Sequence, residues 1–184
     1  MNLVFNRLLQ EAINAHQEER FLEAELKYKE AIELKPTNSK AFYNLAVLLH
    51  DIRRLDEAEI NYKKTIELKP DHPNANINLG ILLHGVRRFN EAEVSYKKGL
   101  EIKPDHPSIY NNLGVTQECL GKLDEAEACY KKAIEFKPDY AEANSNLGNI
   151  LKKINKIDKA LTQYKRAIEL KPSNPDFYLN QAIL

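Results

Sequence analysis

A strict repeat of 34 residues constrains this chain more than any other feature. At this interval the sequence repeats a proline, a tyrosine eight residues before it, and an alanine twelve residues before it. The five prolines are Pro36, Pro70, Pro104, Pro138 and Pro172. A fixed period of this length is typical of a solenoid, in which each unit packs only on its neighbours. The sequence therefore predicts a stack of similar units instead of a chain folded around one central core.

Each repeat is predicted to form two helices. In the repeat that ends near Pro70, apolar residues recur at helical spacing, stop at 51–54 and resume in a second helix. Asp56, followed three residues later by Glu59, predicts a capping box at the start of the second helix. Glutamate and lysine four residues apart predict ion pairs on a solvated outer face. These pairs are Glu59–Lys63, Glu93–Lys97 and Glu127–Lys131.

The recurring residues resemble the tetratricopeptide repeat family over nearly the whole chain. With each proline as position 32, a small residue stands at position 8, alanine at 20 and tyrosine at 24. The resemblance implies an all-α solenoid of stacked helix-turn-helix units that forms a right-handed superhelix. We expect one domain over 1–184, with repeats 5–38, 39–72, 73–106, 107–140 and 141–174, and a partial sixth repeat or cap helix at 175–184. The repeats also resemble the superhelix of O-GlcNAc transferase and Spindly-like proteins.

An asparagine at position 6 is the sharpest functional feature. The resemblance places positions 2, 5, 6, 9, 12 and 13 on a concave surface that binds proteins or peptides. An asparagine amide offers a donor and an acceptor that match those of a peptide bond. We therefore predict a row of side chains, the asparagine ladder, that holds an extended peptide by its backbone. The predicted peptide-binding residues are Asn44, Asn78, Asn112, Asn146 and Asn180, with apolar neighbours Tyr43, Val47, Ile77, Ile81 and Val115.

Two features qualify this prediction. Two alternatives stay open: the asparagines bond neighbouring helices, or they were copied during repeat duplication. The groove is expected to be apolar in its first half and polar in its second, where Asn111, Ser145 and Asn149 flank the ladder. A further row, His16, His50 and His84, is not expected to bind a metal, because helix rows about 10 Å apart rarely bring nitrogens to metal distance.

Composition narrows the classes of function. Twenty-seven basic and twenty-seven acidic residues give zero net charge, which disfavours binding to nucleic acid or an anionic membrane. Cys119 and Cys129 are too few for a disulfide framework, and together with the absence of a signal peptide they favour a cytoplasmic protein. The chain lacks phosphate-loop, zinc-protease and nucleophile-elbow motifs. We therefore expect no catalytic residues, no bound metal and no cofactor.

Three functions remain open. The first is a protein-interaction scaffold that binds extended peptide segments. The second is the substrate-targeting region of a larger enzyme, such as a glycosyltransferase, whose catalytic domain is absent. The third is a scaffold that self-associates through the apolar C-terminal helix at 175–184, which contains Tyr178, Leu179, Ile183 and Leu184.

Overall fold

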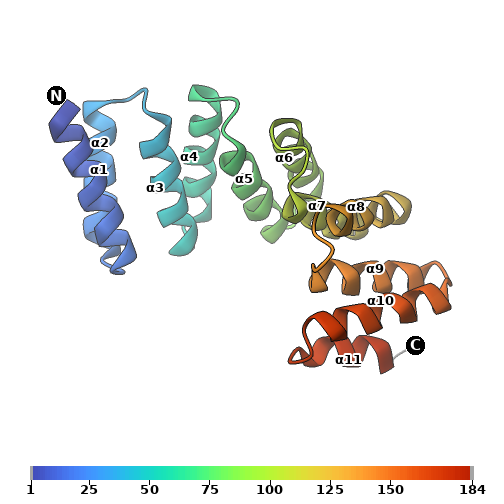
Figure 1. Ribbon diagram of the computed structural model, residues 1–184. Coiled ribbons are helices and arrows are strands. Elements are labelled where there is room, and N and C mark those ends of the chain that lie inside the picture. Colours follow the sequence, from blue (N-terminus) through green and yellow to red (C-terminus); the bar gives the residue numbers. More distant parts are fainter. Residues whose placement is uncertain (1, 183–184) are drawn as a thin grey trace. The chain divides into compact units, whose positions relative to one another are not determined.

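The computed structural model describes residues 2–182, and this part of the chain consists of eleven helices without a strand (Figure 1). The helices are α1 (Asn2–Gln17), α2 (Phe21–Leu34), α3 (Ser39–Asp51), α4 (Leu55–Leu68), α5 (Pro73–Gly85), α6 (Phe89–Ile102), α7 (Pro107–Cys119), α8 (Leu123–Phe136), α9 (Ala141–Lys153), α10 (Ile157–Leu170) and α11 (Pro175–Ala182). The all-α class and the stacked helix-turn-helix units are confirmed. The right-handed superhelix and the single domain over 1–184 stay predictions.

The chain divides into two compact units, which we call the N-terminal unit, up to Leu82, and the C-terminal unit, from Leu83. The N-terminal unit contains the hairpins α1–α2 and α3–α4 and most of α5. The C-terminal unit contains the hairpins α7–α8 and α9–α10, preceded by α6 and followed by α11. Within each unit, the first helices of successive repeats contact each other, as α1 contacts α3 and α7 contacts α9. The first helices therefore form a continuous face in each unit.

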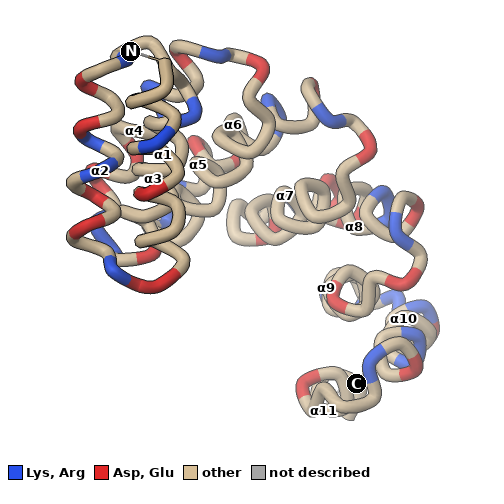
Figure 2. Tube along the Cα trace, turned by 60° about the vertical axis from the view of Figure 1, so that its left-hand side comes forward, with Lys and Arg blue, Asp and Glu red and all other residues tan. Residues whose placement is uncertain are grey.

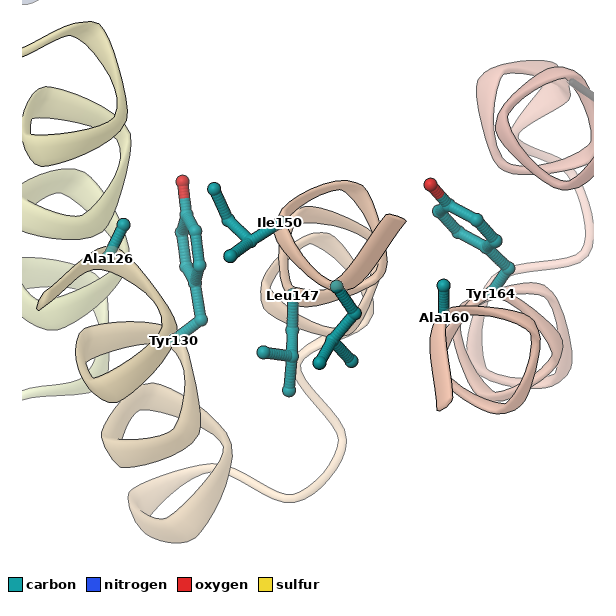
Figure 3. Close-up of a cluster of buried hydrophobic side chains, with 7 residues drawn as sticks. Ala126, Tyr130, Leu147, Ile150, Ala160 and Tyr164 are labelled. Carbon is teal, nitrogen blue, oxygen red and sulfur yellow. The ribbon is translucent and has the colours of Figure 1, made fainter. Parts of the chain in front are cut away.

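Fully buried tyrosines form the centre of each hairpin. Figure 3 shows Tyr130 and Tyr164 on the two sides of α9, packed with Leu147 and Ile150. The small residue at position 8 makes room for the ring, because a Cβ built on Gly148 would lie 2.6 Å from Cε1 of Tyr164. The repeating tyrosine and the small residue opposite it are thus one packing device.

The turn between the two helices of a repeat uses a left-handed residue at position 15. Its φ is 64° at Arg53, 74° at Gly121 and 60° at Asn155. Only Gly121 among these three is free of the steric cost of this conformation. The other turns are therefore held by the packing of the helices that they join.

The predicted capping box at Asp56 is wrong. Helix α4 begins at Leu55, its N-cap is Arg54, and no side chain caps it. Asp56 lies inside the first turn, where a carboxylate still interacts favourably with the helix dipole. Glu59 instead forms the predicted ion pair with Lys63, at 2.7 Å.

The glutamates of the second helices also bind the next repeat, so they do not belong to a merely solvated face. The Glu93 side chain is buried and accepts from Nζ of Lys122, 29 residues later, at 2.6 Å. It also pairs with Lys97 on its own helix at 2.8 Å. Glu25 receives a bond from Arg54 in the N-terminal unit at 2.5 Å, again 29 residues on. Figure 2 shows both signs of charge along these second helices. The sequence identified the partner within each helix, and the structure adds a partner from the following repeat.

Candidate functional site

The ladder asparagines lie on the first helices α3, α5, α7, α9 and α11, and all five are half-buried. Each side chain is therefore partly accessible to solvent while its backbone belongs to the packed helix. Tyr43, Val47 and Val115 are also half-buried, Ile81 is exposed, and Ile77 is buried. Val115 packs against the cluster around Tyr130, so part of its surface serves the core.

Three asparagines are anchored to the preceding first helix. Nδ2 of Asn78 donates to Oη of Tyr43 at 3.1 Å. Nδ2 of Asn146 donates to Oδ1 of Asn111, and Nδ2 of Asn180 donates to Oγ of Ser145, each at 3.1 Å. Every anchor stands at position 5, 35 residues before its asparagine. We call Asn78, Asn146 and Asn180 the anchored asparagines.

The other two asparagines lack this anchor. Leu9 and Ile77 stand 35 residues before Asn44 and Asn112, and a hydrocarbon side chain cannot accept a hydrogen bond. The alternative that the asparagines bond neighbouring helices therefore holds for three of them. Even in those three, the bond uses one of the two amide hydrogens and leaves the oxygen as an acceptor. The anchored amides thus keep most of their capacity to bind a ligand.

A pocket of about 280 Å³ opens beside the ladder in the N-terminal unit. It contains Asn44 together with Tyr43 and Val47, which the sequence predicted as binding residues, and it reaches the ring of Tyr28. The rest of the lining is Ile13, His16, Gln17 and Lys40. Its walls combine aliphatic and aromatic carbon with the amides of Asn44 and Gln17, so it suits an apolar side chain whose backbone contacts Asn44.

The Tyr43 ring is fixed from several sides. Its hydroxyl accepts from Asn78, and its ring lies 4.7 Å from the imidazole of His72. Burial raises the pKa of Tyr43, and hydrogen bonds from Asn78 and Asn74 oppose this rise. Nδ1 of His72 accepts from the backbone N–H of Ala75 and so caps α5. Tyr43 is therefore a rigid wall of the pocket.

The corresponding surface of the C-terminal unit is polar. Asn111 and Ser145 are buried and serve as anchors. Oδ1 of Asn149 accepts from the hydroxyl of Tyr164 at 2.8 Å. Lys153 on α9 pairs with Glu118 on α7 at 2.5 Å. The side chains that flank the ladder in this unit are therefore amides, a hydroxyl and charged groups, whereas the pocket of the N-terminal unit is lined largely by hydrocarbon.

The histidine row does not gather around a metal position. His16 bonds Asp51 at 3.1 Å, and His84 bonds Thr116 at 3.0 Å. Among residues 2–182, no three histidine, cysteine, aspartate or glutamate side chains are grouped as metal ligands would be. No helix in this part of the chain is both long and apolar enough to span a bilayer.

The anchoring role of the residues at position 5 was not predicted from the sequence. Tyr43, Asn111 and Ser145 were predicted only to line the groove, because the bond joins position 5 of one repeat to position 6 of the next. A signal was available, since a polar acceptor at position 5 in one repeat is followed by an anchored asparagine in the next. The Lys40 and His16 walls of the pocket are likewise visible only in the folded chain.

Known proteins show the same architecture. The crystal structure of MamA has a TM-score of 0.86 at 21% identity, covering 94% of this chain and 94% of that chain. YrrB, described as a TPR protein with an unusual peptide-binding site, has a TM-score of 0.83 at 20% identity, covering 96% and 91%. PilF of Pseudomonas aeruginosa has a TM-score of 0.84 at 18% identity, covering 97% and 82%. At these identities, the likeness concerns the fold alone.

Sequence profiles of the repeat itself match most of the chain. Profiles described as tetratricopeptide repeat match residues 27–60, 73–106 and 95–128, and one described as TPR repeat matches 120–155 and 148–183. No curated protein sequence matches the chain. The similarity to O-GlcNAc transferase stays a prediction. The repeat profiles and the folds agree with the hairpins described above, and the chain belongs to the tetratricopeptide repeat family.

Proposed function

We propose that this chain is a protein-interaction scaffold that binds extended peptide segments on the first-helix face of its units. The observation that carries the proposal is the position of the ladder, whose amides are half-buried in a row and keep free hydrogen-bonding groups. Binding through the backbone makes little demand on ligand sequence. The described peptide-binding site of YrrB, which shares the fold, supports the same class of ligand.

The N-terminal unit adds a preference for apolar side chains. Its pocket of about 280 Å³ places Val47 and Tyr43 beside the free amide of Asn44. A ligand residue that bonds Asn44 through its backbone would direct its side chain into this pocket. We therefore expect ligands of the N-terminal unit to carry an aliphatic or aromatic residue.

A retention experiment tests this function. The immobilised chain is compared with a variant in which Asn44→Ala and Asn112→Ala remove one unanchored asparagine from each unit, and both are exposed to a digest of cellular proteins. The control variant carries Asn61→Ala and Asn90→Ala, which remove asparagines from second helices, again one in each unit. We expect the parent and the control to retain the same peptides and the ladder variant to lose them. Equal retention by all three would contradict the ladder.

A specific observation favours self-association as a second function. On α11, Tyr178 is 46% exposed and Leu179 is 58% exposed, although both are apolar. The other two apolar residues of the predicted surface, Ile183 and Leu184, lie outside the described residues. Sedimentation at two protein concentrations tests this idea, with Leu179→Lys as the disrupting variant. A monomer at both concentrations would remove it.

A further inference from the structure

The anchored asparagines all point in the same direction along the chain. In each, Nδ2 donates to a side chain of the preceding first helix, which is α3 for Asn78, α7 for Asn146 and α9 for Asn180. The nitrogen and the oxygen of an amide diverge from one carbon atom. The amide hydrogen trans to Oδ1 points opposite to the C=O bond, so an Nδ2 that donates this hydrogen to the preceding helix turns its Oδ1 toward the following repeat. Within each unit, these amides present the nitrogen toward earlier repeats and the oxygen toward later ones.

This shared orientation distinguishes the two directions of a bound peptide. A residue in an extended chain presents its own N–H and C=O on the same edge, with the N–H first in the N-to-C direction. An asparagine that binds both groups must place Oδ1 against the N–H and its remaining amide hydrogen against the C=O. The ligand C=O then lies on the side of the earlier repeats, and the ligand N–H lies on the side of the later ones.

We propose that the ladder fixes the direction of its ligand. The bound segment runs opposite to the order of the repeats, with its C-terminal end over the earlier repeats of a unit. In the C-terminal unit, the ligand enters with its N-terminal end at α11 and ends at α7. Asn111 and Ser145 act as positioning residues, since they hold the amides of Asn146 and Asn180 without being needed to bond the ligand. This inference rests on the proposed peptide binding and adds the orientation of the peptide.

The two cysteines allow this direction to be measured. Cys119 is exposed at the end of α7, seven residues after Asn112 and thus on the same side of that helix. Cys129 is less exposed, and burial raises the pKa of its thiol to about 11, so a thiol reagent at neutral pH modifies Cys119. A fluorine tag on Cys119 then reports on the α7 end of the ladder.

The probe is a random-sequence library of peptides about twelve residues long, carrying a nitroxide at either the N-terminal or the C-terminal residue. An extended chain of this length spans about 40 Å, so the two labels lie over different repeats. We expect the C-terminal nitroxide to broaden the fluorine signal several-fold more than the N-terminal one. Equal broadening, or stronger broadening by the N-terminal nitroxide, would overturn the direction while leaving peptide binding intact. If neither label broadens the signal, peptide binding fails and the inference fails with it.

A variant separates the anchors from the ladder itself. Asn111→Ala combined with Ser145→Ala removes the two acceptors of the C-terminal unit and leaves all five asparagines in place. Amides without their anchors can flip, so the difference in fluorine broadening between the two nitroxide labels should shrink several-fold. Unfolding curves check that the variant is folded. An unchanged difference in a folded variant would show that the anchors do not set the direction.

Discussion

The two units carry the same asparagine row in different surroundings. In the N-terminal unit, Asn44 has no anchor, because Leu9 stands at position 5 of the preceding repeat, and Asn44 lies beside an apolar pocket. In the C-terminal unit, Asn146 and Asn180 are anchored by Asn111 and Ser145. The amide is the same in both units, but the residue at position 5 of the preceding repeat decides whether it is held. A repeated residue therefore does not imply a repeated role, and one position in the preceding repeat separates an anchored amide from an unanchored one.

The largest difference between the units in the free energy of unfolding is expected from substitutions at position 8. This position is Ala46 in the N-terminal unit and Gly148 in the C-terminal unit, where a Cβ would lie 2.6 Å from the buried Tyr164 ring. Gly148→Val should lower the free energy of unfolding by about 2 kcal/mol, because overpacking displaces a fixed ring. Urea unfolding measures this change.

A matched control comes from the same unit. A Cβ on Gly85 would meet nothing within 4 Å. Gly85→Ala should leave the unfolding midpoint unchanged or raise it slightly, since alanine favours helix over glycine by about 1 kcal/mol. Equal stability of the Gly148→Val and Gly85→Ala variants would show that the Tyr164 ring yields without cost.

The buried glutamates predict the next largest effect. Burial alone would raise the pKa of Glu93, but hydrogen bonds from Lys122, Lys97 and Gln117 outweigh it and lower the pKa to about 2. This carboxylate stabilises the fold fully above its ordinary pKa of 4.5, and the contribution is lost as the pH falls from 4.5 toward 2. Glu93→Gln should cost about 2 kcal/mol at neutral pH and flatten the acid limb of the stability curve.

The N-terminal unit gives the comparison for this prediction. Glu25 has the corresponding partners Arg54 and Lys29, and its pKa is also lowered, since their hydrogen bonds outweigh its burial. Glu25→Gln should therefore flatten the same pH range, by a smaller amount because Glu93 accepts an additional bond from Gln117. Acid unfolding of both variants checks the order, and a pH profile unchanged by either substitution would contradict the role of these ion pairs.

Removal of a tyrosine hydroxyl should change the stability of the two units by different but smaller amounts. Tyr164 donates to Asn149 at 2.8 Å, whereas the buried hydroxyl of Tyr62 makes no hydrogen bond of normal geometry within residues 2–182, although Asn78 lies close to it. Tyr164→Phe should cost about 1 kcal/mol, because it removes a hydrogen bond. Tyr62→Phe should be neutral or slightly stabilising, because it removes an unpaired buried group. Paired thermal unfolding curves measure both, and a larger loss at Tyr62 would reverse this comparison.

The smallest effect is expected from the ladder itself. Asn146→Ala breaks the bond to buried Asn111 and should cost about 0.5–1 kcal/mol, since the helix preference of alanine offsets part of the loss. Asn44→Ala removes no such anchor bond and should leave stability unchanged or slightly improved. Chemical unfolding of both variants checks this order. If Asn44→Ala proved the more destabilising, Asn44 would have a structural role that the anchor pattern does not explain.

Much of the fold could be predicted from the sequence because it depends on features that repeat. The period, Tyr130 and the glycine opposite it specify how a hairpin packs, and they recur in register. Helix starts were less predictable. An aspartate such as Asp56 is suitable both for an N-cap and for a first turn, and α4 begins at Leu55, two residues before the start that an N-cap at Asp56 would give.

The residue types of the candidate site could be predicted from the sequence, but the hydrogen bonds that these residues form between repeats could not. The recurrence of Asn112 and its equivalents was visible, but whether an amide is anchored depends on a residue 35 positions earlier. The bond from Lys122 to Glu93 crosses repeats in the same way, and the local glutamate–lysine spacing did not reveal it. Contacts between repeats thus contain the information that periodicity alone omits.

The most direct test of peptide binding by the ladder observes its side-chain amides. In a nitrogen-15 NMR spectrum of the whole chain, the NH₂ signals of Asn44, Asn112 and Asn146 are followed while random-sequence dodecapeptides are added. The reference signal is that of Asn61 on α4, whose amide bonds the carbonyl of Glu57. The account predicts that the three ladder signals shift in a saturable manner and that the Asn61 signal stays in place. Shifts confined to Asn61 and other second-helix residues would contradict it.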